Sequence, residues 1–133
     1  MKKIALIVLL AINLGSMAFA QKQKFVEVLY FHRTNRCHTC MTIDSTAKAF
    51  ISKEYKKELA SGEVTFTSTD FQVEKENALV KKYAINGPTL LIVHHNKTKE
   101  TKFDLTDTGF SNSVSNPTKF KSELQAKIDE FFR

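Results

Sequence analysis

Two cysteines, separated by two residues, are the feature of the sequence with the clearest chemistry. They form the tetrapeptide Cys37-His38-Thr39-Cys40, and the chain has no other cysteine. Residues three apart lie on one face of a helix, so the two sulfur atoms can bridge with little movement of the backbone. A disulfide that closes so short a loop restricts the unfolded chain less than one that closes a long loop. We therefore expect the pair to act chemically, as a redox couple or as ligands for a soft metal ion, rather than to stabilise the fold.

The sequence around Cys37 favours its thiolate form. At the first turn of a helix, its sulfur would lie near unpaired backbone N–H groups and the positive end of the helix dipole. Arg36 and His38 stand on either side of it, and a nearby positive charge stabilises a thiolate. Cys40 lies one turn further into the helix, so we predict that Cys37 is the nucleophile and Cys40 the resolving thiol. His38 is predicted to assist catalysis, and Arg36 to contact the substrate.

The segments around this tetrapeptide predict a buried strand followed by an amphipathic helix. Residues 25–32 are aromatic and β-branched, which is typical of a largely buried strand. From residue 37 to about 60, apolar residues recur at spacings of three and four, which predicts one helix with Thr34 or Asn35 as its N-cap. The expected apolar face of this helix consists of Ile43, Ala47, Phe50, Ile51, Tyr55 and Leu59.

The rest of the chain predicts further strands and helices in alternation. The expected strands are residues 64–68, 89–94 and 101–105, and the expected helices are residues 74–84 and a terminal helix from Pro117, preceded by a polar loop at 107–116. Strands joined through a helix are expected to lie parallel, and the last two, joined by a short turn, antiparallel. The sequence thus predicts an α/β fold in the order βαβαββα, with a mixed four-stranded sheet and helices on both faces.

The first twenty residues have the pattern of a signal peptide. Lys2 and Lys3 precede an apolar run at residues 4–12 that is too short to span a bilayer, and Ala18-Phe19-Ala20 matches a signal-peptidase site. We expect a signal peptide of residues 1–20 and a mature domain of residues 21–133; an uncleaved anchor is the alternative. The protein is thus expected to be bacterial and exported to the periplasm, with secretion as second choice, and to have no stable membrane anchor after cleavage.

The composition argues for a globular domain with a mixed charged surface. Hydrophobic residues make up 42% of the chain, and 20 Lys and Arg against 14 Asp and Glu give a net charge of +6. Cleavage would remove two lysines and leave +4. The lysines are scattered among acids, whereas a nucleic-acid site would need clustered bases interleaved with aromatic residues. No nucleic-acid partner is therefore expected.

Two motifs together resemble the thioredoxin superfamily over residues 24–132. They are the C-x-x-C helix start and Lys82-Tyr83-Ala84-Ile85-Asn86-Gly87-Pro88-Thr89-Leu90-Leu91. The resemblance implies a thioredoxin-like fold and a cis-proline at Pro88 that faces the active-site disulfide. It also implies that the backbone at Gly87, next to Thr89, pairs with an extended substrate beside Cys37. The implied partners are protein or small-molecule thiols and disulfides and a redox partner protein, with no cofactor besides the Cys37–Cys40 disulfide.

The chain departs from the superfamily at positions that matter for chemistry. Thioredoxins carry Trp before the first cysteine, Gly-Pro between the pair and a buried acid on the first strand; this chain has Arg36, His38-Thr39, and Tyr30 or Phe31 there. His32 or water is then expected to carry the proton of Cys40. Tyr30-Phe31-His32 with Arg36-Cys37-x-Thr39-Cys40 also resembles small exported bacterial thioredoxin-like proteins encoded near arsenic-handling genes.

Two functions of different classes fit these residues. The first is an exported thiol–disulfide oxidoreductase that works through a mixed disulfide, in the direction of reduction, oxidation or isomerisation. The second is a binding module in which the reduced cysteines, with His38 or His32, hold Cu(I) or trivalent arsenic. No resident metal site is expected for the first function. His94 and His95 are interpreted as the solvated end of a strand.

Overall fold

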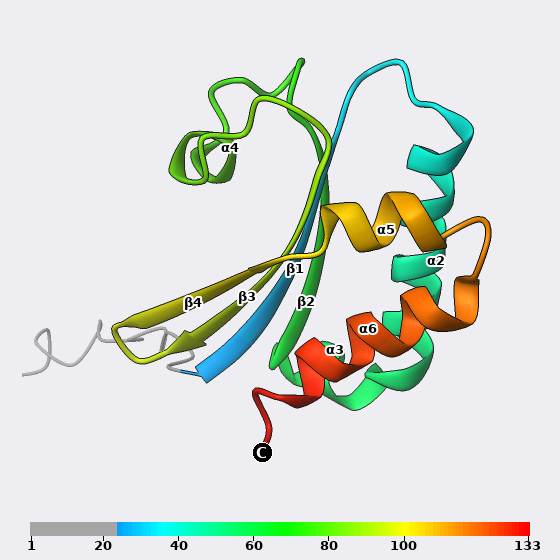
Figure 1. Ribbon diagram of the computed structural model, residues 1–133. Helices are drawn as coiled ribbons and strands as arrows, with labels where there is room; N and C mark the ends of the chain where they lie inside the picture. Colours follow the sequence, from blue (N-terminus) through cyan, green and yellow to red (C-terminus); the bar gives the residue numbers. More distant parts are fainter. Residues whose placement is uncertain (1–23) are drawn as a thin grey trace, which may run out of the picture.

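The computed structural model describes residues 24–133, so the expected signal peptide lies outside the described residues. Within that range, four strands form one mixed sheet in the order β2-β1-β3-β4 (Figure 1). No helix of residues 24–133 is both long and apolar enough to cross a membrane. The elements are β1 (Lys24–His32), α2 (His38–Glu54), α3 (Lys56–Ser61), β2 (Val64–Asp70), α4 (Ala78–Lys82), β3 (Thr89–Asn96), β4 (Lys99–Asp104), α5 (Thr106–Asn112) and α6 (Pro117–Asp129).

Strand β1 is the centre of the fold. It pairs with β2 in parallel and with β3 antiparallel, and five consecutive residues from Val28 to His32 are buried. Helices α2, α5 and α6 cover one face of the sheet and α4 lies on the other (Figure 1), which confirms the expected helices on both faces. A strand buried on both faces needs apolar side chains at successive positions, which explains the aromatic and β-branched run that predicts β1.

Two apolar clusters fill the space on either side of the sheet. The larger cluster joins α2 and α6 to the sheet, and it includes Ile43, Ala47, Ile51 and Tyr55, which were predicted for the inner face of the first helix. The smaller cluster lies under α4 and is made of Leu29, Phe31, Val80, Leu91 and Val93. Helix α2 is thereby fixed to the sheet along its whole length, and its first turn is held at the carboxyl end of β1.

The direction of β3 differs from the expectation that strands joined through a helix lie parallel. The rule holds for β1 and β2, but β3 runs antiparallel to β1 and therefore to β2. Helix α4 has only five residues, about 8 Å of rise, too short to return along a strand. The connection stays at the end of the sheet where β2 finishes, so β3 starts from that end and runs back.

Several boundaries also differ from the sequence prediction. The helix expected over 37–60 is interrupted at Tyr55, whose backbone leaves helical geometry while its hydroxyl donates to Asp129 of α6 at 2.6 Å. The segment expected as a polar loop at 107–116 contains helix α5. Gly109 faces Ile43 so closely that an added Cβ would lie 3.3 Å from the Cδ1 atom of that side chain. Close packing on α2 thus outweighs the poor helix propensity of this glycine- and threonine-rich segment.

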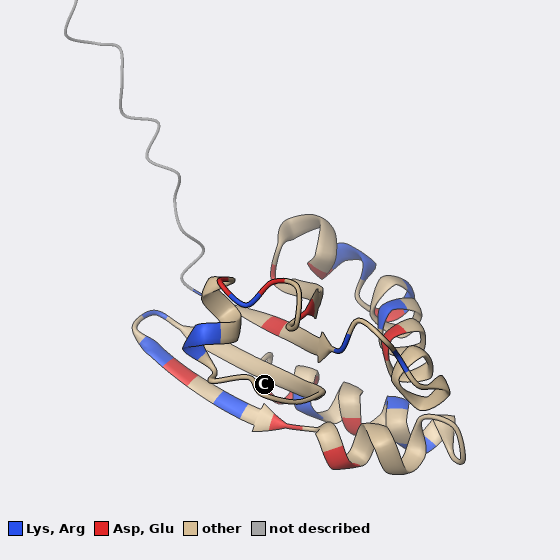
Figure 2. Cartoon of the chain, turned by 90° about the horizontal axis from the view of Figure 1, so that it is seen from above, with Lys and Arg blue, Asp and Glu red and all other residues tan. Residues whose placement is uncertain are grey.

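Strand β4 closes the sheet on one side with charged residues. Lys99, Glu100 and Lys102 alternate in sign along the exposed strand (Figure 2). Charged side chains on an edge strand discourage further strand pairing. This arrangement confirms the expectation of a mixed, solvated surface in this region.

His94 and His95 are not solvated, contrary to the interpretation from the sequence. The His94 side chain is buried between Phe103 and Phe131, with ring centroids at 4.8 and 5.1 Å. Its Nε2–H donates to the carbonyl of Lys127 in α6 at 2.7 Å. His95 stacks on the neighbouring strand residue Phe25 and its Nε2 lies 2.7 Å from a carboxylate oxygen of Glu27. The C-terminal helix docks over this strand end and removes His94 from water.

The buried imidazole predicts a loss of stability in mild acid. Burial lowers the pKa of His94 below its ordinary value of 6.5, although the Lys127 carbonyl and the Glu130 carboxylate oppose the shift. The unfolded chain then binds a proton at a higher pH than the folded protein does. His94 does not destabilise the fold in this way well above pH 6.5, where both states leave it unprotonated. As the pH drops through 6.5, the free energy of unfolding falls.

Urea unfolding of the wild type and of His94→Leu at pH 7.5, 6.5 and 5.5 measures this effect. As the pH falls, we expect the free energy of unfolding of the wild type to decrease more than that of His94→Leu. His38→Gln is the matched control, because His38 is exposed, and it should follow the wild type. A constant difference between wild type and His94→Leu over this range would contradict the assignment.

Candidate functional site

Cys37 and Cys40 form a disulfide at the start of α2, with their Cα atoms 5.1 Å apart. Cys37 is the N-cap of the helix, and the backbone N–H of Cys40 points at its Sγ atom at 3.1 Å. The expected N-cap, Thr34 or Asn35, is therefore wrong, because the sulfur itself takes the place of a capping oxygen. Cys37 is exposed, whereas Cys40 is 9% exposed. An incoming disulfide can thus reach Cys37 but not Cys40.

Tyr30 of β1 lies beneath the second cysteine. Its hydroxyl donates to the backbone carbonyl of Cys40 at 3.1 Å, and its side chain is fully buried. Burial raises the pKa of Tyr30 to about 12, the Asp44 carboxylate acts in the same direction, and the Arg36 guanidinium opposes them. The phenol is therefore a donor at any physiological pH. It ties the first turn of α2 to the central strand.

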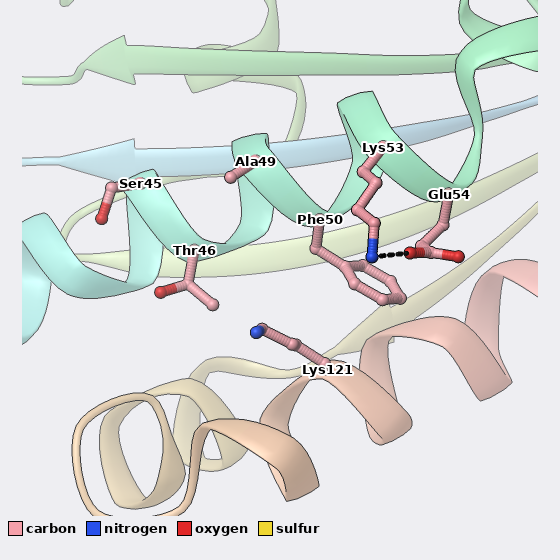
Figure 3. Close-up of a pocket in the computed structure, with 7 residues that line it drawn as sticks. All are labelled: Ser45, Thr46, Ala49, Phe50, Lys53, Glu54 and Lys121. Atoms are coloured by element: carbon pink, nitrogen blue, oxygen red, sulfur yellow. Dashed lines mark ion pairs between the residues drawn. The ribbon is translucent and has the colours of Figure 1, made fainter.

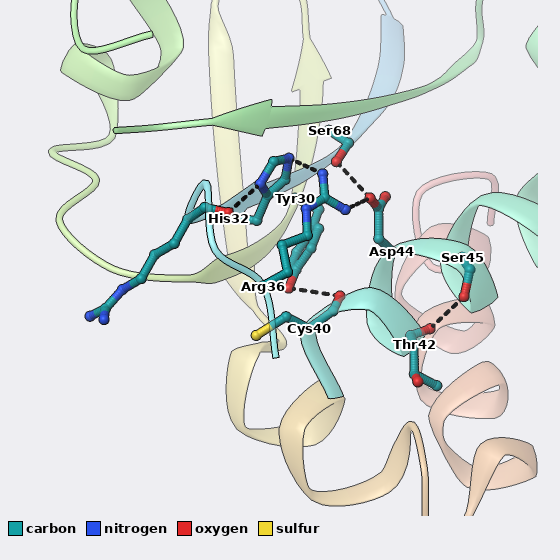
Figure 4. Close-up of polar contacts among 9 residues, drawn as sticks. Tyr30, His32, Arg36, Cys40, Thr42, Asp44, Ser45 and Ser68 are labelled. Carbon is teal, nitrogen blue, oxygen red and sulfur yellow. Dashed lines mark hydrogen bonds and ion pairs between the residues drawn. The ribbon is translucent and has the colours of Figure 1, made fainter. Parts of the chain in front are cut away.

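A chain of polar contacts lies near Cys40 and joins Arg36 to β1, α2 and β2 (Figure 4). The Arg36 guanidinium forms an ion pair with Asp44 of α2 and also contacts Nε2 of His32. The hydroxyl of Ser68 in β2 donates to the same Asp44 carboxylate at 3.0 Å. Arg36 is half-buried. The segment that leads into Cys37 is thereby fastened to β1, α2 and β2 at once.

Both ring nitrogens of His32 contact neighbouring groups. Its Nδ1 lies 3.0 Å from the carbonyl of Arg33, so this nitrogen carries the hydrogen and donates. Its Nε2 faces the Arg36 guanidinium, a donor only, so Nε2 accepts. Both ring nitrogens of His32 are therefore engaged by neighbouring groups.

The segment Gly87-Pro88-Thr89 lies at the same end of the sheet as the disulfide. Thr89 starts β3 and pairs with Phe31 near the end of β1, and its hydroxyl donates to the Gly87 carbonyl at 2.9 Å. Gly87 is half-buried, and a Cβ added there would meet nothing within 4 Å. The space on the side of Gly87 where a side chain would lie is therefore open.

The expected cis-proline is wrong: the peptide bond between Gly87 and Pro88 is trans. The chain reverses earlier, at Ala84, which has a positive φ of 50°. There the N–H of Ile85 bonds to the Val80 carbonyl and that of Ala84 to Lys81, which closes the end of α4. The trans form is the ordinary preference of a bond that precedes proline.

His38, predicted to assist catalysis, is the first residue of α2 and is exposed. The structure thus brings Arg36, Cys37, His38 and Cys40 to one helix start, with Gly87, Pro88 and Thr89 at the same end of the sheet. Residues 24–133 contain no group of three or more His, Cys, Asp or Glu side chains arranged to hold a metal ion.

Sequence reasoning missed Asp44, Ser68 and the role of Tyr30. A signal for Asp44 was present, because it lies seven residues after Cys37 and hence on the same helix face. Tyr30 carries the only hydroxyl among the fully buried side chains of β1. A buried tyrosine hydroxyl needs a hydrogen-bond partner, and this requirement was the signal for Tyr30. Ser68 could not be found, since its contact depends on the parallel register of β2 against β1.

Two surface pockets flank α2 on different sides. One, of about 390 Å³, lies between α2 and α6 and is lined by Ser45, Thr46, Ala49, Phe50, Lys53, Glu54 and Lys121 (Figure 3). The other, of about 540 Å³, lies between α2 and β2 and includes Arg36 and Asp44 of the polar chain. The second pocket therefore contains Arg36, the residue before Cys37, and the first contains none of the residues predicted for the site.

Comparisons with known proteins support the fold. No protein-family model matches the chain, and no curated protein matches it in sequence. A solved structure described as a malarial protein is 22% identical, with a TM-score of 0.50 over 82% of this chain and 99% of that one. The thioredoxin of Fasciola hepatica is 21% identical, with a TM-score of 0.48 over 80% of this chain and 81% of that one. The likeness to the malarial protein concerns the fold, and the observed mixed four-stranded sheet with helices on both faces is the α/β architecture expected from the sequence.

Proposed function

We propose that the protein is a thiol–disulfide oxidoreductase that uses Cys37 and Cys40 as its redox couple. The observation that carries the proposal is the asymmetry of the pair: an exposed sulfur caps the helix N-terminus and a buried one lies a turn behind it. A structural disulfide has no need of an exposed cysteine at the positive end of a helix. A nucleophilic cysteine needs both features, because the substrate must reach its sulfur and the helix N-terminus stabilises the attacking thiolate.

In the reducing direction the chemistry has two exchange steps. The Cys37 thiolate attacks one sulfur of a substrate disulfide, forms a mixed disulfide and releases the other substrate sulfur as a thiolate, which takes a proton from solvent. Cys40 then loses its proton and attacks the Sγ atom of Cys37, which releases the second substrate thiolate. The second thiolate takes up a proton equivalent to the one that Cys40 released. The protein has given two electrons and one proton, its thiolate–thiol pair is now a disulfide, and the substrate is two thiols. A dithiol partner must reduce it again; reversal of the steps oxidises a substrate.

The surroundings assign a positioning role to the polar chain. Tyr30 and Arg36 hold the first turn of α2 and the loop before it, which keeps the two sulfurs within bridging distance. His32, considered above as a proton carrier for Cys40, is engaged at both nitrogens. Water is then the carrier that we propose.

The substrate chain is proposed to lie between Cys37 and the backbone at Gly87. Support comes from the open space at Gly87 and from the pairing of Thr89 with the end of β1. The proposed substrates are disulfides or thiols of proteins or small molecules, with a redox partner protein and no cofactor besides the Cys37–Cys40 pair. Export to the periplasm remains the proposal from the N-terminal sequence. The alternative, Cu(I) or arsenic binding, is favoured by no observation on residues 24–133.

Trapping of the mixed disulfide tests the assigned roles. Cys40→Ser cannot resolve the first intermediate, so incubation with a disulfide-bonded peptide should accumulate a covalent adduct. Cys37→Ser should accumulate at least about tenfold less, because Cys40 is buried and lacks the helix terminus that stabilises a thiolate. Intact-mass spectrometry measures the adducts, and a double Cys→Ser variant gives the background. Faster adduct formation by Cys37→Ser would reverse the roles.

His38 is expected to tune the couple. Arg36 is already paired with Asp44, whereas the side chain of His38, the other neighbour of Cys37, is exposed and in no ion pair of residues 24–133. A protonated imidazole favours the thiolate, which stabilises the reduced protein, whereas the disulfide has no charge to stabilise. The wild type should therefore be more oxidising than His38→Ala near pH 6, by at most about 30 mV for each unit by which the thiol pKa falls.

Equilibration with glutathione buffers near pH 6 measures both potentials. Thr42→Ala is the control, since Thr42 is on the same helix and its hydroxyl bonds only to the His38 carbonyl in the described contacts. An equal or higher potential in His38→Ala would show that His38 does not tune the couple.

A further inference from the structure

A stripe of side chains continues from Cys37 along α2. Met41, Asp44, Ser45 and Lys48 follow it at the three- and four-residue spacing of one helix face. These four residues line the 540 Å³ pocket between α2 and β2, together with Arg36, Phe66 and Ser68. Cys37 lies one helical turn before Met41, and its neighbour Arg36 lines the pocket. No sequence motif assigned this surface to the site.

The lining of this pocket combines apolar and cationic groups. Met41 is 50% exposed, and Phe66 of β2 is half-buried, so both offer carbon and sulfur surface to a ligand. The charged residues of the lining are two cations, Arg36 and Lys48, and one acid, Asp44. That acid is already held by Arg36 and Ser68 (Figure 4).

Lys48 is consequently the charge that a ligand can use. It is exposed, and no carboxylate of residues 24–133 lies within ion-pair distance of it. The other cation has its partner within the protein. A ligand that reaches along the stripe therefore meets an apolar surface first and an unpaired positive charge at its far end.

We propose that this pocket binds the polypeptide that flanks the reacting cysteine of a protein disulfide, and that Lys48 selects an acidic residue in it. The inference rests on the proposed function and names the substrate class of the same site. A protein segment is favoured over a small disulfide because the stripe extends well beyond the sulfur.

The spacing of the stripe gives the position of the acid. Lys48 lies eleven residues after Cys37 in α2, which corresponds to about 16 Å along the helix axis. An extended peptide covers about 3.3 Å per residue, and helical side chains lean toward the N-terminus, here toward Cys37. The acid is therefore expected three to five residues from the substrate cysteine.

Single-turnover kinetics with synthetic peptides test the proposal. Each peptide carries one cysteine as a mixed disulfide with neutral 2-mercaptoethanol, and Glu or Gln three, four or five residues away on either side. The reduced protein is mixed with peptide, and the second-order rate constant is measured. The ratio of rates for Glu and Gln within one protein variant cancels effects common to both peptides.

For the wild type we expect a Glu-to-Gln ratio of about two to five in the best peptide, the range of an exposed ion pair. The ratio should approach one in about 1 M salt, where the Debye length is about 3 Å. Lys48→Gln should abolish the preference and Lys48→Glu should invert it. Lys57→Glu is the matched control: Lys57 is exposed on α3, outside the stripe, so the ratio should stay at the wild-type value.

The outcomes separate the two proposals. A wild-type ratio near one for every peptide, or a preference that survives in Lys48→Glu, overturns the acidic-flank proposal while leaving disulfide exchange intact. Reaction of the wild type with neither the peptides nor neutral hydroxyethyl disulfide overturns the proposed function, and this inference with it. Circular dichroism of both charge-reversal variants verifies that they are folded.

Discussion

The cap that the Cys37 sulfur forms on helix α2 is the contact on which the site depends. The Cys40 N–H points at that sulfur, so the atom proposed to react is also the one that begins the helix. A thiolate in the same place accepts this N–H more strongly than a neutral sulfur does, since charged acceptors form the stronger hydrogen bonds. Reduction of the disulfide would therefore leave the sulfur in a position already built for its charge.

The fold keeps that helix start in place from two sides. The inner face of α2 packs into the larger apolar cluster through Ile43, Ala47 and Ile51, while Tyr30 of the central strand holds the Cys40 carbonyl. On the outer side, Arg36 joins the loop before Cys37 to Asp44. Helix α2 thus has a buried face that fixes its position and an exposed stripe, headed by Cys37, that faces the pocket.

The sequence predicted the parts of this site that depend on local pattern. The period of apolar residues placed β1 and α2, and the C-x-x-C spacing identified the helix start and the exposure of its two cysteines. Prediction from the sequence failed where the structure depends on contacts between segments that are distant in the chain. Helix α5 exists because Gly109 packs against Ile43, and His94 is buried because α6 docks over it. The cis bond expected at Pro88 came from the family resemblance, and the bond is trans.

The equilibrium reduction potential of the Cys37–Cys40 pair tests the central claim, that this disulfide is a working redox couple, most directly. Incubation in graded glutathione buffers at pH 7, followed by alkylation and mass spectrometry, gives the fraction of reduced protein. With the thiolate stabilised at the helix terminus, we expect a value between about −270 and −120 mV, the range of thioredoxin-like catalysts. A value below about −300 mV, typical of structural disulfides, would contradict the claim.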